Sequence, residues 1–268
     1  MTSLYQLTSS GFLKIAGPEA VKFMQGYATC DLTVLDEDAS AIGAICNLQG
    51  RMVTSFLVLK TGTDLVLRMQ RPLVKTTMAF LQKYIVFSKA ELHDISEDYL
   101  CYGSLDQPEI SVENGFAIRL GNRSEIWTTT RLEANLDIGP WQDAELSAGV
   151  AWVSQSSQEE HLPQMFNYHN QGGIDFEKGC YLGQEIVARV RYLGRLKHRM
   201  ARAQISHGEL PAPGDPLFLD TATTKRAGTV INAVHLPTGV GELLATVPLA
   251  LTTGTELPII LYPSNNDL

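Results

Sequence analysis

One eight-residue stretch, KGCYLGQE at residues 178–185, brings several reactive groups together. Cys180 supplies a thiol two residues after the ammonium of Lys178, and Gln184 and Glu185 end the stretch with an amide and a carboxylate. A thiol acts as nucleophile or metal ligand in its thiolate form, which nearby cations favour. The stretch is therefore a candidate active site or cofactor site. The alternative is a glycine-bounded turn that begins a helix.

The residues after this stretch predict a helix. Apolar residues recur with spacings of three and four, at Ile186, Val187, Val190 and Leu193. A helix that begins near Gly183 places Glu185 in its first turn, where a carboxylate complements the helix dipole. Cys180 then lies just before the helix N-terminus, which also favours thiolate. His161 and His169 lie upstream, but their spacing predicts neither a Cys–His pair nor a metal site.

The overall composition predicts a cytoplasmic globular protein. The formal net charge of −8 disfavours direct binding to nucleic acid. No apolar run reaches the roughly 18 residues that span a bilayer, and the N-terminus shows no secretory signal, so no membrane partner is expected. The other cysteines match neither a zinc knuckle nor a redox pair, and are predicted to be small buried thiols: Cys30, Cys46 and Cys101.

Basic residues concentrate just after the stretch. Six of the 21 lie between residues 189 and 202, at Arg189, Arg191, Arg195, Lys197, Arg199 and Arg202. They form either a solvated helix face that leads into a strand or a rim that binds carboxylate or phosphate.

The elements that must position these groups are mixed. Strands are predicted within residues 4–16, 40–47 and 52–60, and helices from about residue 72 and over residues 142–152. Neither a dinucleotide-binding glycine motif nor a P-loop occurs. This pattern favours an α+β fold over a doubly wound parallel sheet. Short apolar runs separated by Gly and Pro then predict an all-β unit, so the expected domains are residues 1–200 and 201–268.

Residues 178–185, followed by VAR, resemble the signature of the YgfZ proteins, which are folate-binding relatives of the glycine-cleavage T-protein. The resemblance covers most of residues 10–200. The segments that carry it are FMQGYATCDL, LQKYIVFSKAEL and LPQMFNYHNQGGIDFEKGCYLGQEIVARVRYLG. It implies a three-part architecture, in which two α+β parts form a folate-binding core around a central opening and a β-barrel follows.

The resemblance also implies a function. The chain would bind tetrahydrofolate, including polyglutamylated forms, and support the assembly or repair of iron–sulfur proteins, among them a radical enzyme that methylthiolates tRNA. Its partners would be folate and iron–sulfur client proteins. The functional thiol of the family falls on Cys180.

Several further residues are expected to contact folate through this resemblance. The family carries a Trp ahead of an AG pair, and Trp141 matches it; an indole suits a pterin or aminobenzoyl ring, although core packing is the alternative. A second family Trp aligns near Ser10, where Phe12 is the nearest substitute. The other expected folate contacts are Lys178, Gln184 and Arg189. The basic run between residues 189 and 202 is expected to bind the glutamate tail of the folate. The pterin edge also needs a carboxylate, and the unranked candidates are Asp31, Glu125 and Glu185.

One departure from the T-protein limits the chemistry. That enzyme carries an Asp pair in a stretch that aligns with QGRMVTSF, where Thr54 and Ser55 stand instead. A hydroxyl cannot supply the charge of a carboxylate at neutral pH, so glycine-cleavage chemistry is not expected. The leading hypothesis is a folate-binding accessory protein. The alternatives are a folate-dependent one-carbon transferase, for aminomethyl or methyl groups, that uses Cys180, and an interaction scaffold with a vestigial pocket.

Overall fold

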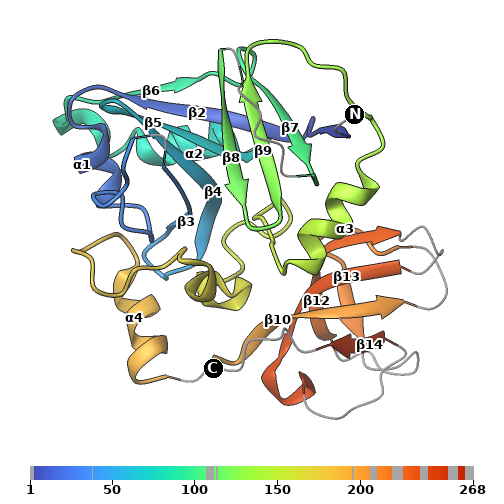
Figure 1. Ribbon diagram of the computed structural model, residues 1–268. Helices are drawn as coiled ribbons and strands as arrows, with labels where there is room; N and C mark the ends of the chain where they lie inside the picture. Colours follow the sequence, from blue (N-terminus) through green and yellow to red (C-terminus); the bar gives the residue numbers. More distant parts are fainter. Residues whose placement is uncertain are drawn as a thin grey trace.

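Three antiparallel sheets with helices packed around them make up the computed structural model of the chain (Figure 1). The structure describes residues 3–37, 39–106, 112, 114–194, 196–205, 210–218, 226–235, 241–252 and 259–262. The mixture of antiparallel strands and helices agrees with the predicted α+β class. Within these residues, no helix is long and apolar enough to cross a membrane.

The first sheet has the strand order β3-β4-β5-β2-β6. Its strands are β2 (Ser10–Ala16), β3 (Ser40–Cys46), β4 (Met52–Thr61), β5 (Asp64–Gln70) and β6 (Glu91–Asp94), and its helices are α1 (Ala20–Gln25), α2 (Leu73–Leu81) and the short η1 (Ile85–Phe87). Side chains alternate between its two faces, as a period of two requires. Leu13 and Leu67 enter the main core, which the helices also line, whereas Phe12 and Val66 enter a second core beneath the second sheet.

The second sheet has the order β1-β7-β9-β8. It comprises β1 (Leu4–Gln6), β7 (Leu100–Ser104), β8 (Gly115–Leu120) and β9 (Arg123–Thr128), and α3 (Gly139–Ser147) follows it. The predicted helix over residues 142–152 therefore begins and ends earlier. Pro140 fits the first turn of α3, and Gly149, with a φ of +64°, turns the chain out of the helix.

The third sheet has the order β11-β12-β13-β10-β14. Its elements are β10 (His198–Ile205), β11 (Pro216–Phe218), β12 (Arg226–His235), β13 (Gly241–Pro248), η4 (Leu249–Thr252) and β14 (Ile259–Tyr262). Closure into a barrel and a domain boundary at residue 200 stay predictions. Four buried residues of this sheet belong to the main core of the first sheet: Met200, Ile231, Val234 and Leu244. The C-terminal stretch PSNNDL, residues 263–268, is predicted from its sequence to be frayed, and it lies outside the described residues.

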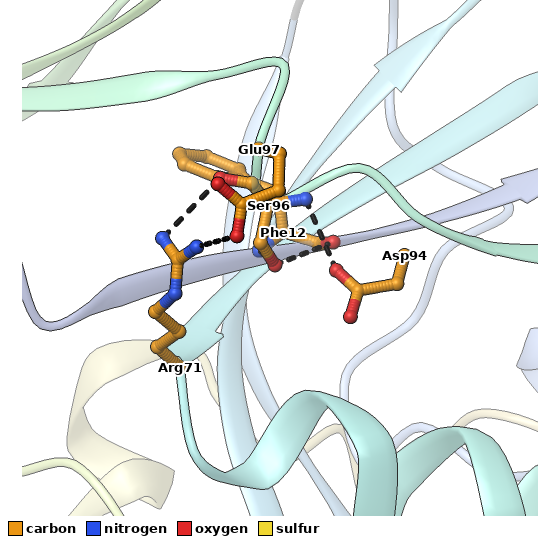
Figure 2. A network of polar contacts seen from close by, with 5 residues as sticks. All are labelled: Phe12, Arg71, Asp94, Ser96 and Glu97. Atoms are coloured by element: carbon orange, nitrogen blue, oxygen red, sulfur yellow. Dashed lines mark hydrogen bonds and ion pairs between the residues drawn. The ribbon is translucent and has the colours of Figure 1, made fainter.

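A network of polar contacts fixes β2 to the turn after β6 (Figure 2). The Ser96 hydroxyl accepts a hydrogen bond from the Phe12 N–H at 3.0 Å, and the Ser96 N–H donates to Asp94, also at 3.0 Å. Arg71, just after β5, donates to the Ser96 carbonyl at 3.3 Å and pairs with Glu97. The network holds the Phe12 backbone in place.

The side chain of Phe12 belongs to the second core. It is fully buried, and its ring centroid lies 5.3 Å from that of Trp127 and 5.6 Å from that of Tyr99. Phe12 therefore packs within the protein, while the residue two positions earlier, Ser10, borders a cavity that is described below.

Candidate functional site

The reactive stretch, residues 178–185, forms a loop that leads into α4 (Gln184–Tyr192), as predicted. The helix begins after Gly183, which has a φ of +83°. A Cβ atom on Gly183 would lie 2.4 Å from the carbonyl oxygen of Asn47, in the turn between β3 and β4. Glycine is therefore required at this position, and it lets the N-terminus of α4 approach that turn closely.

Lys178 anchors this loop to the segment after α1. Its ammonium donates to three backbone carbonyls, those of Gln25 at 3.0 Å, Ala28 at 2.7 Å and Cys30 at 2.7 Å. Burial lowers the pKa of Lys178. Because an ammonium has three hydrogens to donate, all of them serve the protein in this conformation. The geometry gives Lys178 a structural task, and its predicted contact with folate stays untested.

Cys180 is the exposed cysteine of the four. Burial raises the pKa of Cys30 and of Cys46 to about 12 and also raises the pKa of Cys101. The prediction that these three are small buried thiols is confirmed. An external reagent or partner protein therefore meets Cys180 first.

The polar residues around Cys180 mostly satisfy one another. The Gln184 side chain accepts a hydrogen bond from the Tyr181 N–H at 3.2 Å. Glu185 and Arg189 form an exposed ion pair one helical turn apart, 2.7 Å between nitrogen and oxygen. Exposed pairs of this kind contribute little stability, about 0.3–0.5 kcal/mol.

The basic run is divided between two elements, and its role as one anion-binding rim stays a prediction. Arg189 and Arg191 lie on α4, whereas Arg199 and Arg202 lie on β10, where Arg202 pairs with Glu242. Arg195 lies outside the described residues.

A first cavity, of about 550 Å³, lies beside this loop and is called the loop cavity. It is bordered by Cys30, Asp31, Val34, Leu35, Ala41, Gly172, Ile174, Asp175, Phe176, Glu177, Arg191 and Tyr192. Asp31 accepts hydrogen bonds from Thr33 and from Gln25, and these hydrogen bonds, those from Thr33 foremost, lower the pKa of Asp31. One Asp31 oxygen therefore accepts hydrogen bonds from neighbouring residues of the same segment.

A second cavity, of about 250 Å³, lies at α3 and is called the tryptophan cavity. It is bordered by Leu7, Ser9, Ser10, Arg68, Gln70, Ile138, Trp141, Gln142, Glu145, Trp152, Ser154, Pro213, Ile231 and Asn232. Trp141 is 1% exposed, and its ring packs on β7, where a Cβ on Gly103 would lie 2.3 Å from it. Trp141 thus packs in the core and borders a cavity, and Ser10 borders the same cavity.

Glu145 is the carboxylate of the tryptophan cavity, and sequence reasoning missed it. One of its oxygens accepts a hydrogen bond from the Trp152 indole N–H at 2.9 Å. Burial raises the pKa of Glu145, and the charge of Arg68 opposes this. The Arg68 guanidinium carbon lies 4.5 Å from the Trp152 ring centroid. The available signal was spacing, because Glu145 lies four residues after Trp141 and so on the same helix face.

The three carboxylates proposed from sequence lie elsewhere. Glu125 is fully buried and pairs with Arg68. Its other oxygen accepts a hydrogen bond from the Trp127 indole at 2.8 Å, and the Cys101 thiol lies 3.6 Å away. Asp31 borders the loop cavity, and Glu185 is exposed on α4. A contact between any of them and folate stays a prediction.

Thr54 and Ser55 are fully buried in β4. The Ser55 hydroxyl accepts a hydrogen bond from the Val153 N–H at 2.8 Å, and the Thr54 hydroxyl lies 3.7 Å from the sulfur of Met69. Neither residue borders the loop cavity or the tryptophan cavity.

The thiol and the tryptophan cavity are not brought together. Cys180 borders neither of these two cavities, and α4, which follows it, lies far from α3 in Figure 1. Any function that uses both must connect two separate places on the molecule.

Comparison with known proteins gives related sequences and a related fold. No family model matches the chain. The tRNA-modifying protein YgfZ of Cronobacter sakazakii is 28% identical, with 94% of this chain and 87% of that protein covered. The protein of the same name from Escherichia fergusonii is 27% identical, with coverages of 88% and 82%. An uncharacterized protein of Haemophilus influenzae is 28% identical, with coverages of 88% and 86%.

A solved structure resembles this one as well. It is the glycine cleavage system aminomethyltransferase T from Bartonella henselae, with a TM-score of 0.69 and 13% identity over 94% of this chain and 80% of that one. At this identity the likeness shows the fold alone.

Proposed function

Because the chain is a relative of the YgfZ proteins with the fold of the glycine-cleavage T-protein, we propose that it binds tetrahydrofolate in the tryptophan cavity. We further propose that the folate-bound protein is an accessory factor for the assembly or repair of iron–sulfur proteins. The relatives are named tRNA-modifying proteins, so radical enzymes that modify tRNA are the proposed clients.

The presence of two tryptophans and a carboxylate in the lining of one cavity supports the ligand assignment. Trp141 and Trp152 border the tryptophan cavity together with Glu145. An indole face suits a pterin ring, and the amino-pyrimidine edge of a pterin presents two donors that a carboxylate can accept. The second Glu145 oxygen accepts no hydrogen bond from any residue that the structure describes.

The size of the tryptophan cavity suits part of the ligand. Pockets for whole small molecules span roughly 300–1,000 Å³, and this one has about 250 Å³. It therefore suits the bicyclic ring and leaves the aminobenzoyl-glutamate tail outside.

The position of Cys180 favours the accessory role over one-carbon transfer. Group transfer requires the reacting atoms to approach within about 3–3.5 Å, and Cys180 borders neither the tryptophan cavity nor the loop cavity. An exposed thiol is instead accessible to a client protein or to a cluster in transit.

We expect Glu145→Gln to weaken tetrahydrofolate binding about tenfold or more, because hydrogen bonds to a charged group contribute about 1.5–3 kcal/mol. Titration followed by tryptophan fluorescence would measure it, with the exposed Glu133→Gln as the matched control. Equal binding by Glu145→Gln would exclude the role of Glu145. No binding by the wild type would exclude the ligand.

The same variant is expected to be more stable than the wild type at neutral pH. The raised pKa of Glu145 means that the folded state holds this proton more tightly than the unfolded chain does. The free energy of unfolding therefore falls as pH rises from the ordinary value of 4.5 through the folded pKa, and it stays lower above it. Glutamine does not titrate, so its variant does not lose unfolding free energy in this pH range. Thermal denaturation should show a higher melting temperature for Glu145→Gln than for the wild type, and the difference should disappear below pH 4.5.

A deletion strain complemented with Cys180→Ser is expected to show iron–sulfur enzyme activities close to those of the uncomplemented strain, because serine forms no thiolate at neutral pH. The wild-type gene and Gly179→Ala should both restore activity, since a Cβ on Gly179 meets open space. Full restoration by Cys180→Ser would contradict a role for the thiol and favour a scaffold.

A further inference from the structure

A third cavity, of about 460 Å³, adjoins the tryptophan cavity and is called the arginine cavity. Trp152 borders both cavities. Among the residues that the structure describes, the charged ones that border the arginine cavity are Arg119 and Arg123, and none of its lining residues is a carboxylate. The loop cavity and the tryptophan cavity each contain at least one carboxylate. The arginine cavity is therefore the positively charged one of the three, in a chain whose net charge is −8.

Arg123 is the unusual residue of this cavity. It begins β9, is 3% exposed, and its Nε has no hydrogen-bond partner. Within the described part of the chain, its guanidinium forms no hydrogen bond and no ion pair; its guanidinium carbon lies 5.6 Å from the Trp141 ring centroid. Burial lowers the pKa of Arg123, and the charges of Glu145 and Glu125 oppose this.

Two other arginines that are buried or partly buried have a carboxylate partner, whereas the partly buried Arg199 also has an Nε without a hydrogen-bond partner. Arg68 pairs with Glu125, and Arg202 pairs with Glu242. An arginine stays protonated in proteins, and burial of a charge without a partner is unfavourable. An anion that entered the arginine cavity would supply the counter-ion that Arg123 lacks.

We propose that the arginine cavity is a carboxylate-binding site built on Arg123, and that its ligand is the glutamate tail of a folate whose ring occupies the tryptophan cavity. This inference rests on the proposed function. The ring-sized volume of the tryptophan cavity leaves the tail to be placed, and the arginine cavity shares Trp152 with it. The assignment differs from the sequence-based expectation, which put the tail on the basic run at residues 189–202.

The test compares two ligands, tetrahydrofolate and a methyl-tetrahydropterin that lacks the aminobenzoyl-glutamate tail. Arg123→Gln is expected to lose about 10- to 100-fold in affinity for tetrahydrofolate, the range of charged hydrogen bonds, and to bind the pterin like the wild type. Arg123→Lys keeps the charge and should retain part of the folate affinity. Arg71→Gln removes an arginine that pairs with Glu97 at the surface (Figure 2) and should bind both ligands normally.

Each outcome decides between the two proposals. Equal tetrahydrofolate affinities of the wild type and Arg123→Gln would overturn the carboxylate site and leave the proposed function standing. If Arg123→Gln lost affinity for both ligands, Arg123 would act only through the structure of the protein. That result would also overturn the carboxylate site. Wild-type protein that binds neither ligand would overturn both proposals. Thermal melting checks folding, and Arg123→Gln should melt no lower than the wild type, because it removes a buried unpaired charge.

Discussion

Replacement of Glu125 by glutamine is expected to lower the free energy of unfolding by about 3–5 kcal/mol, the usual cost of removing one partner of a buried ion pair. Arg68 is 4% exposed and Glu125 is fully buried, so the variant leaves the Arg68 charge in the interior without its ion-pair partner. The pair also joins β5 of the first sheet to β9 of the second. Urea denaturation with linear extrapolation would measure the change.

The exposed pair of Arg71 and Glu97 provides the matched control for this measurement (Figure 2). Glu97→Gln should cost about 0–1 kcal/mol. The double variant Arg68→Met with Glu125→Gln should regain most of the loss, because it removes both desolvated charges and keeps an acceptor for the Trp127 indole N–H. A loss in Glu125→Gln no larger than that in Glu97→Gln would show that the pair contributes little to stability.

Trp141→Ala is expected to cost about 3–5 kcal/mol, as for other large-to-small changes of buried aromatic residues. Its ring is 1% exposed and packs on Gly103 in the second core. Thermal or urea denaturation would measure the loss. Tyr192→Ala, which removes a ring that is 61% exposed, should change stability by about 0.5 kcal/mol or less. Similar losses in both variants would contradict the packing role.

This loss affects any ligand experiment at Trp141. An alanine variant that binds no folate has lost core packing as well as a stacking face, so weak binding alone does not identify a contact. Trp141→Phe keeps most of the packing and is the appropriate variant for titration. The chain has three tryptophans, Trp127, Trp141 and Trp152, and the last two border the tryptophan cavity, so fluorescence still reports on it.

Local patterns in the sequence predicted the local structure. The apolar stripe after Gly183 predicted α4, and the wide spacing of Cys30, Cys46 and Cys101 fitted buried thiols. The resemblance to a family gave the overall fold, which composition alone left at the level of α+β. These features depend on neighbours in the chain or on a pattern that spans most of it.

The candidate site could not be predicted in the same way, because its contacts join residues that are distant in the sequence. Glu125 and Arg68 are 57 positions apart, and the Lys178 ammonium bonds to carbonyls about 150 positions earlier. A sequence shows that a charge exists but not whether another charge neutralises it. Arg123 therefore resembled any other residue of a strand until its surroundings were known.

The core shared by the first and third sheets can be completed only late in the synthesis of the chain. Met200, Ile231, Val234 and Leu244 complete a core that begins at Leu13, and α3 packs against β12 and β13. During synthesis the N-terminal sheets leave the ribosome well before these strands do. The nascent chain must therefore carry uncovered apolar surface until nearly all of it has been translated, and such surface promotes aggregation and chaperone binding. Truncation near residue 200 would make that transient state permanent.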